Sequence, residues 1–337
     1  MPPSNGAPAD CRNQFCIGGV SVQLQGMGRQ IVALVPALAP FQSDAENADI
    51  SLQLEWDDSF NRESEHKLFD SGSVWELFPD EAGFRFDFRV PALGAVPYKR
   101  LVVDSAFSAG VLHLNRAAFN AYPRVAPLDY PLDELLIMHR LTQEKAIELH
   151  GTGIVRPNGE ANLFVGHSGA GKSTTTRLWT DIEDVEVLSD DRIIVRRDEA
   201  AVETPCGAGA SSKREVLRPR DSSASLSNLS AQDDKATKAI RMYGTPWHGE
   251  AMYASPNSAL LSRIFVLEHG FGNVITPLSP SQAVAELFAR SFVPFHRHEY
   301  VDSALDFLQE LVDSVPVYRY SFEPDQRAVE KILHFHD

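Results

Sequence analysis

One stretch of the chain decides the fold: Gly-His-Ser-Gly-Ala-Gly-Lys-Ser at residues 166–173. It fits the pattern G-x-x-x-x-G-K-[ST] at every fixed position. An apolar run at 161–165 leads into it, and residues 174–180 can continue as a helix. A strand–loop–helix unit of this kind binds phosphate, because the backbone N–H groups of the glycine-rich loop and the positive end of the helix face the same anion. We therefore predict a P-loop.

The P-loop pattern assigns chemical roles to individual side chains. Lys172 reaches the β- and γ-phosphates of a nucleotide, and the Ser173 hydroxyl can ligate Mg²⁺. The nucleotide-binding residues predicted from the pattern are Gly166, Ser168, Gly169, Ala170, Gly171, Lys172, Ser173 and Thr174. We expect ATP as its Mg²⁺ complex, while the pattern leaves GTP and pyrophosphate open.

Two adjacent carboxylates follow the next apolar run. Residues 185–188 lead through a serine into Asp190 and Asp191. A carboxylate at a strand end beside a P-loop can hold Mg²⁺ directly or through water, and a second one beside it can accept a proton from an attacking hydroxyl. The alternative is a solvated pair of acids in a turn. Their position one helix after the P-loop favours a compact kinase, and the chain lacks the Leu-Ser-Gly-Gly-Gln signature of transporter ATPases.

A histidine, the P-loop and the two acids together resemble a known family. His150, the P-loop and the Asp190-Asp191 pair look like the catalytic core of HPr serine kinase/phosphorylase, which is related to the nucleotide site of ATP-dependent phosphoenolpyruvate carboxykinase. The resemblance implies that Asp190 is the general base and that Asp191 helps to hold the metal. It also implies that His150 orients or stabilises the transferred phosphoryl group. Without the resemblance, His150 is an ordinary histidine in a strand.

The resemblance extends more loosely to about residue 295. Tyr-Gly-Thr-Pro-Trp-His-Gly-Glu at 243–250 resembles a hallmark of HPr-kinase-like proteins that are not true HPr kinases. The segment offers an aromatic wall at Trp247, a titratable His248 and an acid at Glu250, so we expect a loop that lines the substrate or the nucleotide. The alternative is a turn capped by a packed tryptophan. The glycine-rich stretch that follows the core in true HPr kinases is missing, which leaves HPr as a substrate and the reverse, phosphorolytic reaction open.

Composition and charge limit the classes of partner. The 337 residues are 43% hydrophobic and 23% charged, the balance of a globular protein rather than a disordered one. The net charge of −15 argues against nucleic acid or an anionic membrane as the main partner, because both need a cationic surface. Neither a signal peptide nor a membrane span is evident, and the three cysteines show neither a metal-ligand spacing nor a disulfide framework. We expect a cytoplasmic protein and leave its oligomeric state, including a homo-oligomer, open.

The texture of the sequence changes along the chain. A flexible tail at 1–14 precedes a region of short apolar runs and turns at 15–125, which we predict to be a mostly β N-terminal domain. Within it, Gly-Phe-Arg-Phe-Asp-Phe at 83–88 alternates apolar and polar residues, the pattern of a half-buried strand. The catalytic domain is expected at 130–337, with a serine-rich, irregular excursion at 198–239.

Periodicity places the elements of the catalytic domain. We expect strands at 146–155, 161–165 and within 258–268, and helices at 132–142, 279–292 and 300–312. The predicted fold class is therefore α/β, a P-loop kinase domain of the HPr-kinase/carboxykinase type with a mixed sheet, preceded by the mostly β domain.

These features predict an ATP-dependent kinase that transfers the γ-phosphoryl group to a hydroxyl, serine-like, of a peptide, a protein or a small molecule. The alternative is a nucleotide-binding regulatory protein that uses ATP occupancy to recruit a partner, with little or no chemistry. The presence of two neighbouring acids favours the enzyme, because occupancy alone needs only the acid that holds the metal.

Overall fold

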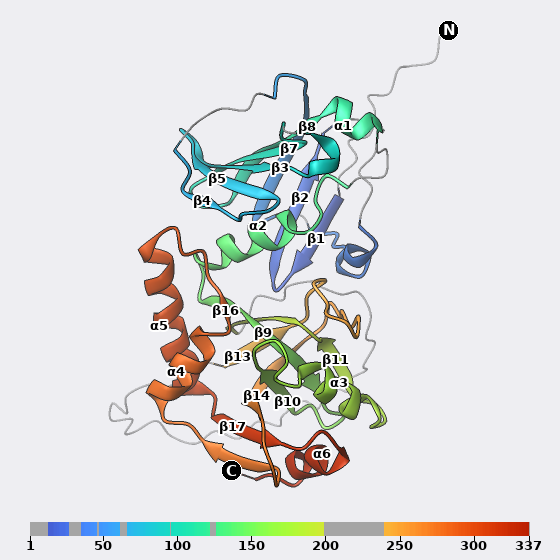
Figure 1. Cartoon of the computed structure of the whole chain (residues 1–337), viewed down its shortest axis with the longest axis vertical. Coiled ribbons are helices and arrows are strands. Elements are labelled where there is room, and N and C mark those ends of the chain that lie inside the picture. Colours follow the sequence, from blue (N-terminus) through green and yellow to red (C-terminus); the bar gives the residue numbers. More distant parts are fainter. Residues whose placement is uncertain are drawn as a thin grey trace, which may run out of the picture.

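Two β-sheets follow one another along the long axis of the molecule (Figure 1). The structure, a computed structural model, describes residues 13–26, 35–45, 47–60, 66–94, 96–121, 126–198 and 239–336. Most of the predicted tail and of the predicted excursion lies outside these residues. The described chain is a mixed α/β structure that is mostly β, in agreement with the predicted fold class at that level.

The first sheet is built from the region predicted to be mostly β. Its strands are β1 (Asn13–Ile17), β2 (Val20–Gln25), β3 (Ile50–Asp57), β4 (Phe69–Asp70), β5 (Trp75–Pro79), β6 (Gly83–Phe88), β7 (Lys99–Asp104) and β8 (Ala109–Asn115). They lie in the order β1-β2-β3-β8-β7-β6-β5-β4, and β3 is parallel to both of its neighbours. Short helices accompany the sheet: η1 (Pro36–Phe41), η2 (Pro91–Leu93) and α1 (Arg116–Ala121).

Strand β6 corrects the prediction of a half-buried strand. Its phenylalanines face the hydrophobic core, as the alternation indicates. The polar face is buried as well, because Asp87, only 1% exposed, accepts hydrogen bonds from Arg100 Nε at 2.6 Å and from Arg100 Nη2 at 2.9 Å. The Arg85 guanidinium lies over the ring of Phe78, 4.4 Å from its centre. Paired charges thus replace water on the face that the pattern assigned to solvent.

The second sheet is mixed and is organised by two long strands. Its members are β9 (Ala146–Val155), β10 (Ala161–Val165), β11 (Glu186–Ser189), β12 (Arg192–Arg197), β13 (Ile240–Tyr243), β14 (Ser258–His269), β15 (Val274–Pro277), β16 (Ser291–Phe292) and β17 (Val317–Phe322). The first half of β9 pairs with β12, and its second half pairs with β10 and β11. Strand β14 pairs in parallel with β10 and with β17, so three strand ends meet at one edge of the sheet.

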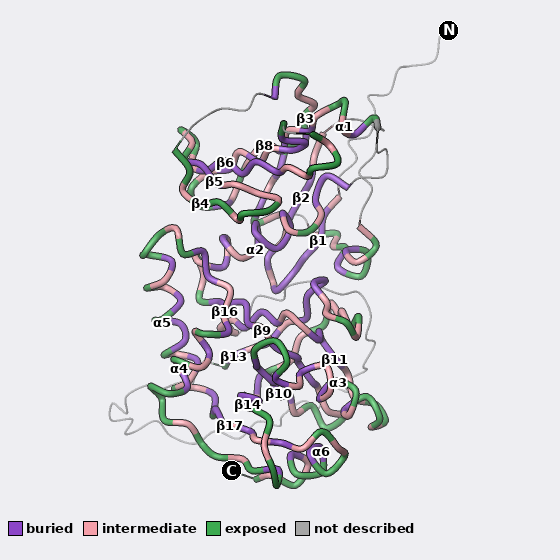
Figure 2. Tube along the Cα trace, viewed as in Figure 1, coloured by how far each residue is buried: buried purple, intermediate pink, exposed green. Residues whose placement is uncertain are grey.

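Helices cover both faces of the second sheet (Figure 1). Helices α4 (Pro280–Phe288) and α5 (His298–Ser314) pack into one hydrophobic core. Helices α3 (Lys172–Thr180) and α6 (Gln326–Leu333) pack into another. The predicted helix at 279–292 is shorter than expected, since it ends at Phe288 and residues 291–292 form β16. Figure 2 shows how closely the buried positions follow the central strands.

Helix α2 (Leu132–Leu141), predicted at 132–142, lies between the two sheets (Figure 1). We expected it to begin the catalytic domain, but its apolar side chains Leu132, Leu136 and Ile137 belong to the hydrophobic core of the first sheet. A second contact joins the sheets where the turn between β1 and β2 meets β12. There Arg196 Nη1 donates to the Gly18 carbonyl oxygen at 2.8 Å, and a Cβ atom on Gly18 would lie 2.4 Å from Ile194.

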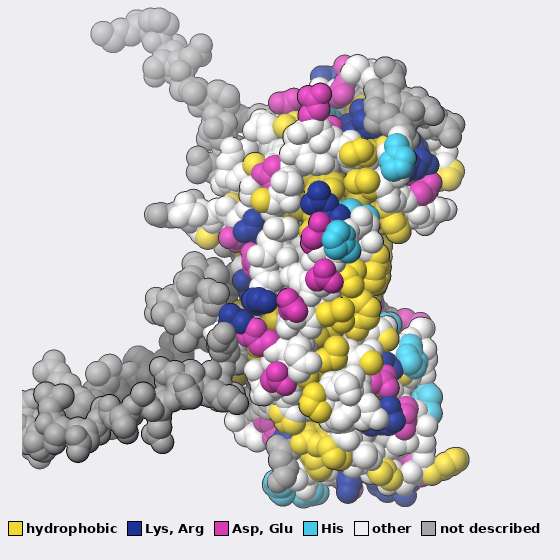
Figure 3. Space-filling model, turned by 90° about the vertical axis from the view of Figure 1, so that its left-hand side faces the viewer, with side chains coloured by type: hydrophobic (Ala, Val, Ile, Leu, Met, Phe, Trp, Pro, Cys, Tyr) yellow, Lys and Arg dark blue, Asp and Glu magenta, His cyan; other side chains and the backbone are white. Residues whose placement is uncertain are grey.

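Two further observations bear on expectations from composition. Cys16 is disulfide-bonded, which corrects the expectation that the cysteines form no disulfide. No helix in the described part of the chain is long and apolar enough to cross a membrane, and the cytoplasmic location stays a prediction. On the face that carries α5, acidic and basic side chains are interspersed beside a band of hydrophobic ones (Figure 3).

Candidate functional site

The loop after β10 has the backbone geometry that its sequence predicts. Strand β10 runs into 166–171, and α3 begins at Lys172. Gly169 and Gly171 have φ values of +80° and +100°, in the left-handed region that favours glycine. A Cβ atom on Gly171 would also lie 2.5 Å from Cζ of Phe322, so this position is closed to larger residues. The strand–loop–helix unit predicted for the P-loop is therefore present.

The P-loop lysine is folded back onto its own loop. Lys172 is 7% exposed, and its Nζ donates to the carbonyl oxygens of Gly166 at 3.0 Å and His167 at 3.3 Å. Burial lowers the pKa of Lys172 to about 8; the nearby Asp191 carboxylate opposes this shift, and the guanidinium of Arg192 adds to it. A partly desolvated cation thus stands in the concave side of the loop, where an anion would be attracted strongly.

A cavity of about 480 Å³ opens beside the loop. It is lined by His150, Ser168, Gly169, Gly171, Lys172, Ser173, Thr174, Asp190, Asp191, Gly249, Glu250 and His269. The structure thus brings together most of the residues predicted for the site, from β9, the P-loop, the end of β11 and the 243–250 segment. Gly166 and Ala170 contribute to the loop itself, with Gly166 accepting from Lys172 and Ala170 buried.

Asp190 is enclosed by backbone N–H groups. Its carboxylate, on a residue that is 2% exposed, accepts hydrogen bonds from the N–H groups of Gly249 at 2.9 Å, Ala251 at 2.8 Å and Tyr253 at 3.2 Å. These bonds fix the loop over residues 249–253 against the end of β11. Three of the about four acceptor positions of this carboxylate are thus occupied, and Asp190 still lines the cavity, so its predicted role as general base stays a prediction.

Asp190 and Asp191 form an acid pair, and Asp191 is its more open member. Its side chain is 27% exposed, and its Oδ1 lies 2.9 Å from Nε2 of His150. Arg192 binds its Oδ2. Burial alone would raise the pKa of Asp191, but the hydrogen bond from His150 and the charge of Arg192 outweigh it, so the pKa lies below its usual value. Asp191 is therefore an ionised carboxylate that faces the cavity.

One part of the 243–250 segment packs in a hydrophobic core, and another part lines the cavity. Trp247 is buried in the core of the first sheet, and its Nε1 donates to Asp133 Oδ2 at 3.0 Å, the packed tryptophan of the alternative prediction. Glu250 lines the cavity. His248 is half-buried and is not among the residues that line the cavity; its Nδ1 lies 3.1 Å from the carbonyl oxygen of Gly249.

Three residues near the site, Arg192, Glu134 and His269, were not predicted from the sequence as site residues. Arg192 joins Asp191 to Glu134 of α2, with 2.9 Å between Arg192 Nε and Glu134 Oε1. His269, at the end of β14, places Nε2 2.7 Å from the carbonyl oxygen of Gly169. A histidine directly after a buried strand is a weak signal that could have indicated His269. The Arg192–Glu134 contact joins positions 58 residues apart and has no local signal.

The donor set of the cavity fits Mg²⁺ bound together with phosphate. No group of three or more His, Cys, Asp or Glu side chains suited to a metal occurs among the residues that the structure describes. Ser173 and Asp191 nevertheless line one cavity with the P-loop. Mg²⁺ commonly takes one or two protein oxygens and completes its shell with water and substrate phosphate, so these two side chains suffice.

Comparison with known proteins adds no family assignment. No protein-family model matches the chain, and no curated protein matches it. The resemblance to HPr serine kinase/phosphorylase therefore stays a prediction that depends on His150, the P-loop and the acid pair.

Proposed function

We propose that the chain is an ATP-dependent kinase of the HPr-kinase/carboxykinase type, which transfers the γ-phosphoryl group to a hydroxyl of a peptide, a protein or a small molecule. One observation carries the proposal. The P-loop with Lys172, the Ser173 hydroxyl and the ionised Asp191 all line one cavity at the end of β10. Phosphoryl transfer needs little more than such a cradle, a metal and a positioned carboxylate.

Each side chain then has a defined task. The backbone of the P-loop and Lys172 would bind and neutralise the phosphates. Mg²⁺, held by Ser173 and through water by Asp191, would supply further charge neutralisation when bound. Asp191 would accept the proton of the attacking hydroxyl while the new O–P bond forms and ADP leaves with the electrons of the broken P–O bond. His150 would hold Asp191 in orientation through its Nε2 contact.

Asp191 would take the general-base role predicted for Asp190. The proposed base must reach the cavity with a free lone pair, and the three N–H donors on Asp190 leave it less able to do so. Asp190 would instead hold the 249–253 loop, which brings Glu250 to the cavity.

Label transfer tests the proposal. Purified protein is incubated with Mg²⁺ and ATP labelled at the γ-phosphate, together with fractions of peptides and small hydroxyl compounds. We expect a labelled product with the wild type and none with Lys172→Ala, which loses the phosphate-binding cation. Full transfer by Lys172→Ala would overturn the kinase, whereas tight ATP binding without any transfer would support the regulatory alternative.

A further inference from the structure

Two neighbouring acids in the first turn of α2 reach two different segments that flank the P-loop cavity. Asp133 and Glu134 are both buried. Asp133 Oδ2 accepts from the indole N–H of Trp247 at 3.0 Å, and Glu134 Oε1 accepts from Arg192 Nε at 2.9 Å. A buried acid that uses its oxygens on a distant segment fixes that segment, since losing the bond would leave a buried polar group unsatisfied.

The contact of Asp133 leads to one member of the acid pair. Trp247 lies two residues before Gly249, whose N–H group donates to Asp190. The same carboxylate accepts from Ala251 and Tyr253. The position of Trp247 thus sets where the 249–253 loop begins its course around Asp190.

The contact of Glu134 leads to the other member. Arg192 binds Glu134 through Nε and Asp191 through Nη1, and its guanidinium lies 4.1 Å from the ring centre of Phe292. A second acid, Glu148, lies 3.4 Å from Arg192 Nε. Arg192 is thereby clamped between α2 and β9 on one side and presented to Asp191 on the other.

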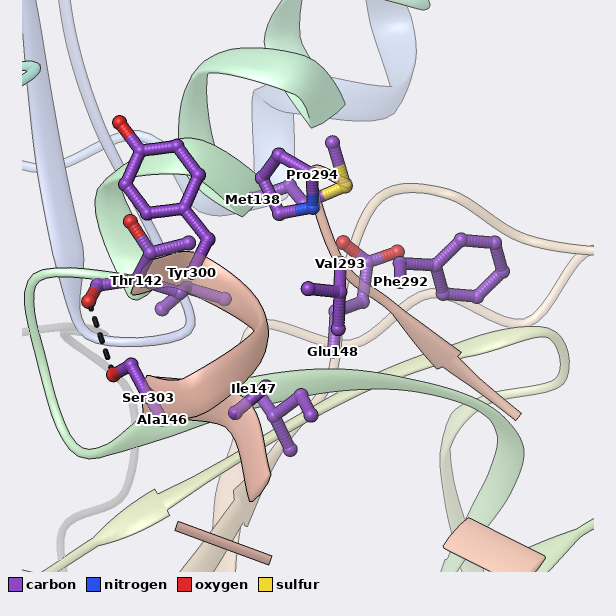
Figure 4. A pocket seen from close by; sticks show the side chains of 12 residues that line it. Met138, Thr142, Ala146, Ile147, Glu148, Phe292, Val293, Pro294, Tyr300 and Ser303 are labelled. Carbon is purple, nitrogen blue, oxygen red and sulfur yellow. Dashed lines mark hydrogen bonds between the residues drawn. The ribbon is translucent and has the colours of Figure 1, made fainter. Parts of the chain in front are cut away.

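Glu148, which contacts Arg192 from β9, lines a small pocket. It is fully buried, and Figure 4 shows its side chain among Phe292, Val293 and Pro294. The pocket has a volume of about 10 Å³, room for about one water molecule. Burial raises the pKa of Glu148 well above its usual value, and the nearby Glu134 carboxylate adds to the shift. The charge of Arg192 opposes this shift, and Glu148 shares the Arg192 guanidinium with Glu134.

The first turn of α2 is itself fixed by the first sheet. Lys99 of β7 is fully buried, and its Nζ binds the Asp129 carboxylate and the carbonyl oxygen of Pro127 at 3.4 Å, just before α2. Leu132 and Leu136 hold the helix in the core of that sheet. The two acids therefore stand on a support that belongs to the N-terminal half of the molecule.

We infer that Asp133 and Glu134 are positioning residues, through which the first sheet holds the acid pair of the P-loop cavity in place. Asp133 acts through Trp247 and the 249–253 loop, and Glu134 acts through Arg192. The catalytic consequence rests on the proposed function, because it assumes that Asp191 takes the proton. The structural consequence, an ordered 249–253 loop, does not depend on any activity.

Hydrogen exchange tests the Asp133 arm without substrate. We expect the amides of Gly249, Ala251 and Tyr253 to exchange about tenfold faster in Trp247→Phe and in Asp133→Ala than in the wild type. Asp133→Asn, which keeps an acceptor oxygen, should restore much of the protection. Trp75→Phe, a half-buried tryptophan of the first sheet, is the matched control. Wild-type exchange at these amides in Trp247→Phe would overturn the inference.

Kinetics test the Glu134 arm. Glu134→Gln should lower kcat for phosphoryl transfer about tenfold, with the KM for ATP within about twofold, because the base is misplaced while the phosphate cradle is untouched. Glu160→Gln removes a carboxylate that pairs with Arg263 outside the cavity and should leave both constants unchanged. Equal kinetics for Glu134→Gln and wild type would overturn this arm. If the wild type transfers no phosphate, the proposed function fails, and the exchange experiment still decides the structural inference.

Discussion

Buried charged side chains have different surroundings in the two sheets. In the first sheet, Asp87 and Arg100 close on each other in a two-fold hydrogen-bonded pair, and Lys99 closes on Asp129. Beside the second sheet, Lys172 of α3 is also buried, at 7% exposure, but it rests on backbone carbonyl oxygens and faces a cavity. Residues of the same type therefore serve packing in one region and are available to a ligand in the other.

The difference lies in what each charge is bonded to. A buried charge whose hydrogen-bonding positions are taken by an opposite charge and that faces no cavity gains little from a ligand, because binding would first have to break the pair. A charge that rests on neutral carbonyl groups can exchange them for phosphate oxygens and gain attraction. Variants in the two regions should accordingly change different measurements, stability in the first and turnover in the second.

The largest effect is expected from the open carboxylate. Asp191→Asn keeps the size of the side chain but removes the proposed proton acceptor, so turnover by the proposed kinase should fall by about 10²- to 10⁴-fold. Affinity for ATP, measured by calorimetry, should change little, since Lys172 and the P-loop remain. Asp190→Asn should instead lower the midpoint of thermal unfolding, because it disturbs the cage of three N–H donors. The opposite pattern, with Asp190→Asn the slower enzyme, would return the base role to Asp190.

Breaking a closed pair in the first sheet should cost stability. Asp87→Ala takes this carboxylate away from the buried Arg85 and the partly buried Arg100, and the free energy of unfolding should fall by about 3–5 kcal/mol in urea titrations. ATP affinity of the folded protein should equal that of the wild type. A large loss of ATP affinity with unchanged stability would contradict the contrast drawn between the two sheets.

Low pH should reduce the stability contributed by α2, the helix between the two sheets. His139 of α2 is fully buried against Phe107, His296 and Tyr300, and burial lowers its pKa from 6.5 to about 3. The unfolded state takes up the proton first, so the stability is complete above about pH 6.5 and is lost as the pH falls toward 3. At pH 5 the loss from this residue is about 2 kcal/mol. The same titrations at pH 7 and pH 5 measure it, and His139→Gln should flatten the dependence.

The smallest effect is expected from an ion pair that is neither deeply buried nor part of the cavity. Glu160 binds Arg156 and Arg263 at the β9–β10 turn, where the side chains are partly exposed. Glu160→Gln should change the free energy of unfolding by less than about 1 kcal/mol, because water screens such pairs. If Glu160→Gln lowered the free energy of unfolding as much as Asp87→Ala does, burial would not explain the difference in stability between the two pairs.

Local patterns predicted the elements of the site well. The glycines and the lysine at 166–173 dictate their loop because φ and the helix start depend only on neighbouring residues. The strands at 146–155 and 161–165 match β9 and β10 residue for residue. Short-range physics is enough at these positions.

Contacts between distant segments could not be predicted from those patterns. The donors on Asp190 come from about sixty residues further along the chain, and nothing in the Asp-Asp pair shows which member receives them. The polar face of β6 looked solvent-exposed because alternation reports residue type and not what covers it. For this reason neither the donors around Asp190 nor the burial of β6 could be foreseen.

Helix α2 has a practical consequence for anyone who shortens this protein. A fragment that starts at residue 130 would keep the whole P-loop region and would look complete by its motifs. It would also expose to water the apolar side chains of α2 that pack into the core of the first sheet, including Leu132, Leu136 and Ile137. Such a fragment should aggregate on expression. A truncation at the end of α2 would avoid this exposure but would remove Asp133 and Glu134.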